Sequence, residues 1–336
     1  MERQVDVAII GAGTAGLFAL RQVKRFTDSY VVIDGGTLGT TCARVGCMPS
    51  KVMIQTAEDY QHRHDLALTG IDGGERLALQ APKAMDYVRQ MRDSFVEHVM
   101  GGPVSKLGDK LIRSHARFRA PGVIEVDGGT VHANRVIVAT GSKPVVPQAW
   151  QAFGDRVITT DRIFEQESLP NSMAVLGLGV IGLELGQALA RLGVEVTGVD
   201  MLERVGGLAD DTVNETAVQA MRQEFPLWLG EKAELAEGTD GRVRVTAGDK
   251  SVEVEQVLVA AGRKPNVDGL GLDTLGLELD ARGVPTYDPE TMKVPGAPIF
   301  IAGDANAELP LQHEARDEGQ IAGYNAARGT EQRFRR

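Results

Sequence analysis

The chain has two cysteines, Cys42 and Cys47, and they lie five positions apart. Pro49 suits the first turn of a helix, so we expect Cys47 to lie close to a helix N-terminus. Lys51 follows within one further turn. A helix N-terminus and a neighbouring cation both lower the pKa of a thiol, and the thiolate is the reactive form. The types and spacing of these residues therefore favour a redox couple.

Two other interpretations of the cysteine pair stay open. A zinc site would need its remaining ligands from six scattered histidines and from carboxylates, because the chain has no further cysteine. We therefore expect no metal site. An inert buried pair is the second alternative. A structural disulfide framework needs more cysteines than these two.

A glycine motif follows an apolar run at two places in the chain. The motif in VDVAIIGAGTAG, residues 5–16, consists of Gly11, Gly13 and Gly16, and the motif in MAVLGLGVIGLE, residues 173–184, consists of Gly177, Gly179 and Gly182. An Ala- and Leu-rich helical pattern follows each motif, and then a β-branched run that ends in an acid. These acids, Asp34 and Asp200, both come 23 residues after the first glycine of their motif.

Each residue type in this motif has a physical reason. The first glycine makes a tight turn between strand and helix, the second lets a pyrophosphate approach the backbone, and the third lets helix and strand pack closely. The helix N-terminus attracts the phosphates, and the acid accepts hydrogen bonds from ribose hydroxyls. A glycine-rich turn without a ligand is the alternative for one motif, but the matched repetition predicts two dinucleotide sites.

The rest of each half follows the same order of elements. A hairpin pattern, VIEVDGGTVHA and later RVRVTAGDKSVEV, precedes a strand that ends in a small-residue turn, RVIVATGSKP and later QVLVAAGRKP. Residues from about 51 to 101 indicate long, mostly helical antiparallel elements. We therefore expect an α/β fold of two Rossmann-like dinucleotide-binding domains, one inserted in the other, each with a small β-meander.

A third phrase near the end of the chain has an acid at the end of a strand. The apolar run 299–302 leads to Gly303 and Asp304, and a helical stretch starts at about His313. Ligands of α/β folds bind at the carboxyl ends of strands, so Asp304 is a candidate ligand contact. A helix N-cap is the alternative for Asp304.

Composition excludes several classes of protein. The chain is 43% hydrophobic and 24% charged, with a formal net charge of −10, so we expect a globular protein without affinity for nucleic acid or anionic lipid. No secretory signal precedes the first strand-like run, and the longest uncharged apolar stretch, 173–183, is too short to span a bilayer. We expect a cytoplasmic protein without a membrane segment.

The motifs together resemble a known family. The first glycine motif, CARVGCMPSK, the ATG at 139–141, GLGVIGLE, AAGRKPN and the Gly303–Asp304 pair stand in the order seen in class I pyridine nucleotide–disulfide oxidoreductases. Dihydrolipoamide dehydrogenases are the most similar branch, and glutathione and mercuric reductases are related ones. The resemblance covers nearly the whole chain.

The resemblance implies two cofactors, FAD and NAD. FAD would contact the first motif, with Asp34 on the adenosine ribose and Asp304 on the ribityl chain. Further FAD contacts implied by the resemblance are Gly35, Thr41, Lys51, Ala116, Thr140, Gly141, Ser142, Gly303 and Gln312. NAD would contact the second motif, Val180, Ile181, Asp200, Ala261 and Gly262. Both acids are aspartates, which favours NAD over NADP at the second site, although Arg204 lies nearby.

The resemblance also implies the catalytic residues. Cys42 and Cys47 would form a disulfide beside the flavin, with Cys42 as the outer thiol that exchanges with substrate and Cys47 as the inner thiol. Lys51 and Glu184 would form an ion pair near the flavin; without the resemblance, Glu184 would be interpreted as a solvated helix residue. The implied substrate is a small-molecule or lipoyl-carrier dithiol.

The sequence departs from the family pattern in two places. Arg44 lies in the loop ARVG between the cysteines, where the nearest relatives carry Leu-Asn. Family members also continue into a C-terminal domain that builds a homodimer and supplies a histidine base, with a glutamate five positions later. We expect this domain to be absent here. The chain would then be either a fragment of a longer reductase or a naturally short protein. We interpret His313 and Glu318, which have the same spacing, as residues of a flavin-domain helix.

Three functional hypotheses follow. The first is a dihydrolipoamide dehydrogenase-like flavoenzyme or its catalytic core; the second is an NAD(P)H-dependent reductase of another disulfide or a metal ion; the third is a non-catalytic flavin- and NAD-binding redox sensor. The predicted layout is an FAD-binding domain over 1–145, an NAD-binding domain over 146–267, and the second part of the FAD-binding domain over 268–336.

Overall fold

The structure, a computed structural model, describes residues 2–335, so the terminal residues of the predicted ranges 1–145 and 268–336 lie outside it. The chain forms two compact units. The first unit consists of Met1–Cys42, Val96–Lys143 and Lys264–Arg336, and the second unit of Ala43–Phe95 and Pro144–Arg263. Which cofactor each predicted range binds stays a prediction.

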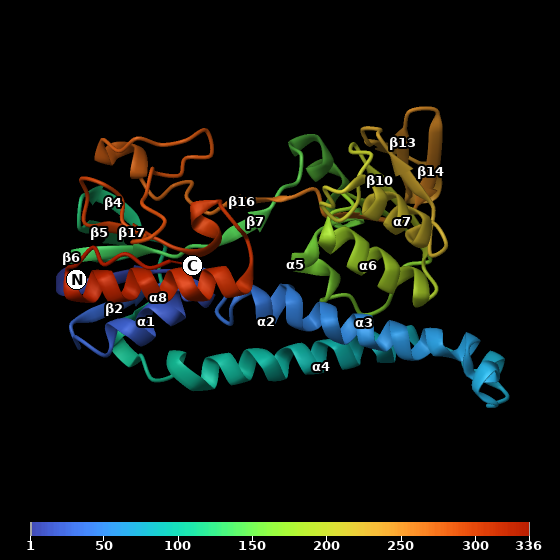
Figure 1. Cartoon of the computed structure of the whole chain (residues 1–336), viewed down its shortest axis with the longest axis horizontal. Coiled ribbons are helices and arrows are strands. Elements are labelled where there is room, and N and C mark those ends of the chain that lie inside the picture. Colours follow the sequence, from blue (N-terminus) through green and yellow to red (C-terminus); the bar gives the residue numbers. More distant parts are fainter. Residues whose placement is uncertain (1, 336) are drawn as a thin grey trace. The chain divides into compact units, whose positions relative to one another are not determined.

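The first unit is built on a sheet whose central strands are parallel. The strand order is β3-β2-β1-β6-β5-β4, and β17 also pairs with β6. Strands β2, β4, β5, β6 and β17 of this sheet are labelled in Figure 1. The strands are β1 (Glu2–Ile10), β2 (Tyr30–Ile33), β3 (Leu111–Ile112), β4 (Arg117–Ala120), β5 (Val123–Val126), β6 (Gly129–Val138) and β17 (Ile299–Ile301). Strands β4, β5 and β6 form an antiparallel meander. The fully buried apolar strand residues form the core on both faces of this sheet.

Two helices of the first unit lie side by side, α1 (Thr14–Val23) and α8 (Gln312–Arg328) (Figure 1). Gly319 and Gly323 of α8 lie so close to the backbone of Ala15 and Ala19 of α1 that a Cβ at either glycine would overlap it. The absence of a side chain therefore lets the two backbones touch.

The second unit repeats the plan. A parallel sheet has the order β11-β10-β9-β15-β8, and a separate antiparallel meander has the order β12-β13-β14. The strands are β8 (Val157–Ile158), β9 (Ser172–Leu176), β10 (Glu195–Asp200), β11 (Leu227–Leu229), β12 (Glu234–Glu237), β13 (Val243–Ala247), β14 (Lys250–Val254) and β15 (Gln256–Val259). The helices next to this sheet are α5 (Thr160–Ile163), α6 (Val180–Arg191) and α7 (Asp211–Met221). A further two-stranded sheet pairs β16 (Arg263–Pro265) with β7 (Ser142–Pro144), and the boundaries between the two units fall within these two strands.

The segment from the cysteines to residue 101 is mainly helical, as predicted for residues from about 51 to 101. It contains α2 (Thr41–Val45), α3 (Cys47–Gln61), short 3-10 turns, and α4 (Ala81–Val99). Helix α3 packs against α6, and Met53 and Ala57 share a buried core with Leu185 and Leu189 of α6.

The predicted fold class is confirmed: two Rossmann-like parallel sheets are present, each with its own meander, and residues 144–263 interrupt the first unit. The halves differ in how the meander joins the parallel sheet. Strand β6 is continuous from the hairpin into the parallel sheet, whereas Glu255 separates β14 from β15. Across residues 2–335, the structure contains no helix that is both long enough and apolar enough to cross a membrane.

Candidate functional site

The first glycine loop lies between β1 and α1. Gly11 has a φ of +107°, which residues with a Cβ rarely adopt, and it lies against the backbone of Ala139. Gly16 packs in the same way against the carbonyl of Gly11. Gly13 is the N-cap of α1 without a side-chain cap, and no atom lies within 4 Å of where its Cβ would stand. The loop is therefore tightly packed except at its second glycine, where the first N–H groups of α1 are available to a ligand.

The second glycine loop, between β9 and α6, has the same geometry. Gly177 has a φ of +94°, and a Cβ there would be 2.6 Å from the carbonyl oxygen of Ala260. Gly182 lies against the carbonyl of Gly177, and Gly179 faces open space. The next two residues of α6, Val180 and Ile181, are exposed apolar side chains. The repeated sequence motif is therefore also a repeated structure.

Each predicted ribose acid holds its own glycine loop. Asp34 Oδ2 accepts a hydrogen bond from the N–H of Ala12 at 2.7 Å, and Asp200 Oδ2 accepts one from the N–H of Leu178 at 2.6 Å. In both cases Oδ1 accepts a second bond from the N–H two residues further along the chain. The structure thus brings each acid to the middle position of its G-x-G, at the carboxyl end of the sheet.

Gly303 and Asp304 lie at the same edge of the first sheet as Ser142. The Ser142 hydroxyl donates to Asp304 Oδ2 at 2.6 Å. The nearby Thr140 hydroxyl is buried and has no hydrogen-bond partner among the described residues. The N-cap alternative for Asp304 is wrong for the long helix, because the N-cap of α8 is Leu311. Asp304 lies instead in a short 3-10 turn, Gly303–Asn306, that directly follows β17.

Two residues that were not predicted as site residues support this edge. Glu318 of α8 is 1% exposed, and its Oε2 accepts hydrogen bonds from the N–H of Gly303 at 2.6 Å and from Asn306 at 2.7 Å. Asn266 donates through its backbone N–H to the carbonyl of Gly141 at 2.8 Å. Asn266 is the last residue of the AAGRKPN motif, so the sequence did contain a signal for it.

The histidine-glutamate spacing at 313 and 318 does not produce a pair. His313 is exposed near the start of α8, and its imidazole lies 3.9 Å from Glu314. Glu318 is buried against the turn at Gly303. The interpretation of both as residues of a helix in the first unit is confirmed.

The remaining predicted cofactor contacts lie at loops and helix starts. Gly35 directly follows Asp34, and a Cβ there would be 2.7 Å from the backbone nitrogen of His115, next to the buried Ala116. Other residues of the set occupy the first position of α2 (Thr41), the first position of α8 (Gln312), and the turn after β15 (Ala261 and Gly262).

The cysteine segment forms two consecutive helices. Cys42 is half-buried in α2, and the exposed Cys47 is the first residue of α3, with Gly46 as N-cap. The prediction that Cys47 lies at a helix N-terminus is confirmed. One turn later, Lys51 Nζ donates to Glu184 Oε1 of α6 at 2.6 Å, so the ion pair implied for these two residues is present.

Comparison with known proteins agrees with this arrangement. The family model described as pyridine nucleotide-disulphide oxidoreductase matches residues 5–319. Dihydrolipoyl dehydrogenase of Thermus scotoductus is 31% identical over 335 residues, covering 96% of this chain and 70% of that protein. A mercuric reductase of Bacillus cereus is 29% identical, over 98% of this chain and 52% of that protein. The solved structure of LpdA from Mycobacterium tuberculosis is similar with a TM-score of 0.84 and 26% identity, over 98% of this chain and 74% of that one.

These matches confirm the family resemblance and its cofactors. The family consists of oxidoreductases that use FAD and NAD(H). The residues present fit two such dinucleotides. The space at Gly13 and at Gly179 would be filled by a Cβ, and the buried Thr140 hydroxyl leaves a hydrogen-bonding group for a ligand at the edge of the first sheet.

Proposed function

The chain belongs to the pyridine nucleotide-disulphide oxidoreductase family, and we propose that it passes electrons between a dithiol substrate and NAD through a redox-active Cys42–Cys47 pair and FAD. One observation carries the proposal: Cys47 is the first residue of a fifteen-residue helix whose next turn presents Lys51. The positive end of the helix dipole stabilises a thiolate at this position.

The step performed by the cysteines is thiol–disulfide exchange. A substrate thiolate attacks the Sγ of Cys42, the Cys42–Cys47 bond breaks, and Cys47 leaves as a thiolate. The second substrate thiolate attacks the substrate sulfur of this mixed disulfide and releases Cys42. The substrate loses two electrons and becomes a disulfide, the cysteine pair gains them, and the substrate protons pass to the pair or to solvent.

The cofactor assignment follows the two loops. The first loop, Asp34, Thr140 and Asp304 would hold FAD, and the second loop with Asp200 would hold NAD. The chemistry that FAD supplies when bound is two-electron transfer between the reduced cysteine pair and NAD⁺. The role of Lys51 is to keep a positive charge beside Cys47, and the role of Glu184 is to fix the direction of the Lys51 side chain.

Preference for NAD over NADP is supported by the surroundings of Asp200. Both of its carboxylate oxygens accept hydrogen bonds from backbone N–H groups, so its negative charge stays directed at the loop, where it would repel a 2′-phosphate. Arg204, the nearest cation in sequence, pairs with Asp211 and donates to two carbonyls at 208–209. Its guanidinium is thus already engaged by groups other than a ligand.

The substrate proposed is a dihydrolipoamide-like dithiol, supported by relatives that carry the name dihydrolipoyl dehydrogenase. The similarity to a mercuric reductase favours a second candidate, the reduction of a metal ion or of another disulfide by NAD(P)H. A non-catalytic redox sensor would bind both cofactors and show no dithiol turnover.

Anaerobic titration of the FAD-loaded chain with one equivalent of dihydrolipoamide tests the proposal. We expect a long-wavelength absorbance from the Cys47 thiolate beside the flavin, and its loss in Cys47→Ser. The matched variant Cys42→Ser should show the band before any dithiol is added, because Cys47 is then already a thiolate. A titration without the band in the unaltered chain refutes the redox pair. Reduction by NADH without dithiol turnover selects the sensor.

A further inference from the structure

Two ion pairs join α3 to α6. The two residues of each pair are the same number of positions apart in the sequence. Lys51 and Glu184 are 133 residues apart, and Glu58 and Arg191 are also 133 residues apart. Within each helix the two paired residues are seven positions apart, which is two turns and about 10 Å of helix. The helices therefore run in the same direction and in register over these two turns.

The same register continues to the helix N-termini. Four residues before Lys51 is Cys47, the first residue of α3, and four residues before Glu184 is Val180, the first residue of α6. The helix that carries the reactive thiol and the helix that follows the second glycine loop therefore begin level with each other. Their positive dipole ends lie at the same end of the helix pair.

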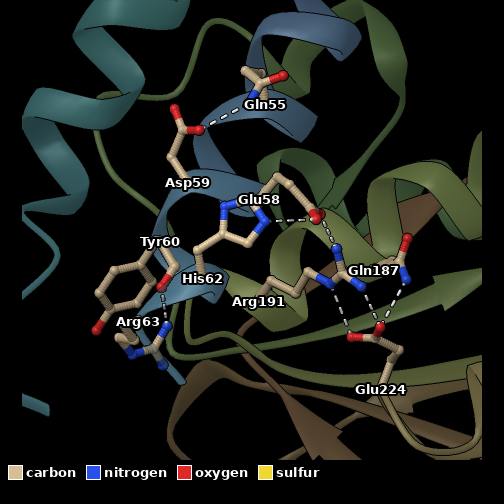
Figure 2. A network of polar contacts seen from close by, with 9 residues as sticks. All are labelled: Gln55, Glu58, Asp59, Tyr60, His62, Arg63, Gln187, Arg191 and Glu224. Atoms are coloured by element: carbon tan, nitrogen blue, oxygen red, sulfur yellow. Dashed lines mark hydrogen bonds and ion pairs between the residues drawn. The ribbon is translucent and has the colours of Figure 1, made fainter. Parts of the chain in front are cut away.

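The pair far from the cysteine is the better anchored one. Arg191 donates to both carboxylate oxygens of Glu224, at 3.1 and 2.6 Å, and also pairs with Glu58 of α3 (Figure 2). Gln187 donates to Glu224 at 2.8 Å. The side chains of Arg191 and Glu224 are 20% and 21% exposed and that of Glu58 is 41% exposed, whereas those of Lys51 and Glu184 are 59% and 36% exposed.

This geometry gives the two pairs different tasks. The two-pronged contact with Glu224 fixes the direction of the Arg191 guanidinium, whose remaining nitrogen meets Glu58 of α3. A single exposed ammonium–carboxylate contact contributes little on its own and adapts to the position of its helix. The Lys51–Glu184 contact therefore depends on where α3 is held. The apolar core around Met53 and Ala57 holds α3 against α6, and Arg191, anchored by Glu224 just beyond α7, fixes which residues of the two helices face each other.

We propose that Arg191 is a positioning residue, which keeps α3 in register on α6 so that Lys51 meets Glu184 beside Cys47. Its significance for catalysis rests on the proposed function, but the positioning itself does not. Arg191 acts through the register of the two helices and touches neither cysteine.

A double-mutant cycle tests the proposal with the alkylation rate of Cys47 as the readout. The cycle is made in FAD-loaded, reduced Cys42→Ser protein, so that Cys47 is the only thiol, and iodoacetamide is the probe. With Arg191 present, Glu184→Gln should change the rate about threefold or more, because the charge beside Lys51 is lost. In Arg191→Gln the same Glu184 substitution should change the rate less than about 1.5-fold, because the contact is already broken.

A second variant protects the test against misfolding. Glu58→Gln removes the carboxylate of α3 that pairs with Arg191 and leaves the Arg191–Glu224 contact intact, so α6 keeps its structure. It should abolish the effect of Glu184→Gln on the alkylation rate of Cys47, as Arg191→Gln does. The matched control is Arg156→Gln, which breaks another two-pronged contact of the second unit, with Glu237, away from α3. This control should leave the effect of Glu184→Gln unchanged.

Three results would overturn the proposal: no effect of Glu184→Gln with Arg191 present, an equal effect with and without Arg191, or the same uncoupling by Arg156→Gln. Alkylation uses neither substrate nor NAD. A chain that lacks dithiol turnover but shows the coupling would therefore refute the proposed function and leave the positioning role intact.

Discussion

The two glycine loops are nearly the same structure, but the helices that follow them are held by different means. Helix α1 touches α8 through backbone, where Gly319 and Gly323 leave no room for a side chain. Helix α6 touches α3 through an apolar core and two ion pairs in register. The same dinucleotide element thus has a support of close backbone contact in one unit and a support that includes ion pairs in the other.

The two kinds of helix contact determine different things: close backbone contact determines how near the helices lie, and ion pairs determine which residues face each other. Backbone contact between helices tolerates no added atom, because the interior packs as densely as a crystal and cannot yield without strain. Paired charges at the rim of a helix contact fix which residues face each other while contributing little to stability. We therefore expect substitutions in the first unit to act on folding, and substitutions at the α3–α6 contact to act on position and charge.

The largest expected effect is at Gly319. Gly319→Val would place a branched side chain on the carbonyl of Ala15, and such overpacking costs about 3 kcal/mol or more when backbone blocks it. We expect a lower melting temperature and loss of FAD on gel filtration. His313→Val, at an exposed position of the same helix, should leave both unchanged. A Gly319→Val protein that keeps its melting temperature and its flavin would show that the α1–α8 contact is not close-packed.

The second effect distinguishes the two loops by ligand. Gly13 and Gly179 have φ values of −77° and −64° and no atom near a would-be Cβ, so alanine fits both positions in the empty loop. A bound pyrophosphate would meet the new methyl group. We expect Gly13→Ala to weaken FAD binding about 10- to 100-fold, or roughly 1.4–2.7 kcal/mol, and Gly179→Ala to weaken NADH binding by a similar factor.

Equilibrium titrations of flavin and of NADH on both variants check this assignment, with melting curves as the control for folding. The effects should not cross: each alanine should alter one ligand only. If Gly13→Ala weakened NADH as much as FAD, the assignment of one cofactor to each loop would be refuted.

Sequence reasoning succeeded where a structure is local. Gly11, Gly16 and Asp34 lie within one strand-turn-helix-strand unit, so their spacing alone determines that they meet. The position of Cys47 at the start of a helix followed from Pro49 two residues later. In both cases the relevant partners are close in the chain or belong to one supersecondary motif.

Sequence reasoning failed where the partner of a residue comes from a distant segment that has no motif. Glu318 appears from sequence as an ordinary polar residue of a helix, yet it is buried because β17 delivers the N–H of Gly303 to it. Arg191 and Glu58 meet only because α3 packs on α6 in one register. On each helix the two paired residues are seven positions apart, and this spacing acquires a meaning only when the partner helix is known.

A third, smaller effect concerns the acids. Asp34 has a guanidinium near it, since Arg113 Nη1 lies 3.8 Å from Oδ1, whereas the cation that follows Asp200 is paired with Asp211. Removing the charge of Asp200 should therefore let a 2′-phosphate approach. We expect Asp200→Asn to shift the ratio of NADPH to NADH affinity about tenfold, close to 1.4 kcal/mol, toward NADPH.

Dissociation constants for both nucleotides measure this ratio. The double variant Asp200→Asn with Asp211→Asn should shift it further, because Arg204 is then released from its carboxylate. An unchanged ratio in both variants would mean that Asp200 does not face the adenosine ribose.

The smallest effect is a difference in acid stability between the two helix contacts. The hydrogen bond from Arg191 lowers the pKa of Glu224 below its ordinary value of 4.5, so the folded protein releases this proton more readily than the unfolded chain does. The resulting stability is fully present above about pH 4.5 and is lost as the pH falls through the lowered pKa. The α1–α8 glycine contact has no such charge and no such dependence.

The two tryptophans, Trp150 and Trp228, both lie in the second unit, so their fluorescence reports unfolding of that unit. Between pH 5 and 3 the free energy of unfolding from urea titrations should fall less steeply in Glu224→Gln than in the unaltered chain. The difference should stay below about 1 kcal/mol because solvent screens this partly exposed pair. Glu215→Gln, an equal charge change at an exposed position of α7, is the control and should keep the original slope. Superimposable profiles for Glu224→Gln and the unaltered chain would mean that the Arg191 contact contributes only register, with no measurable stability.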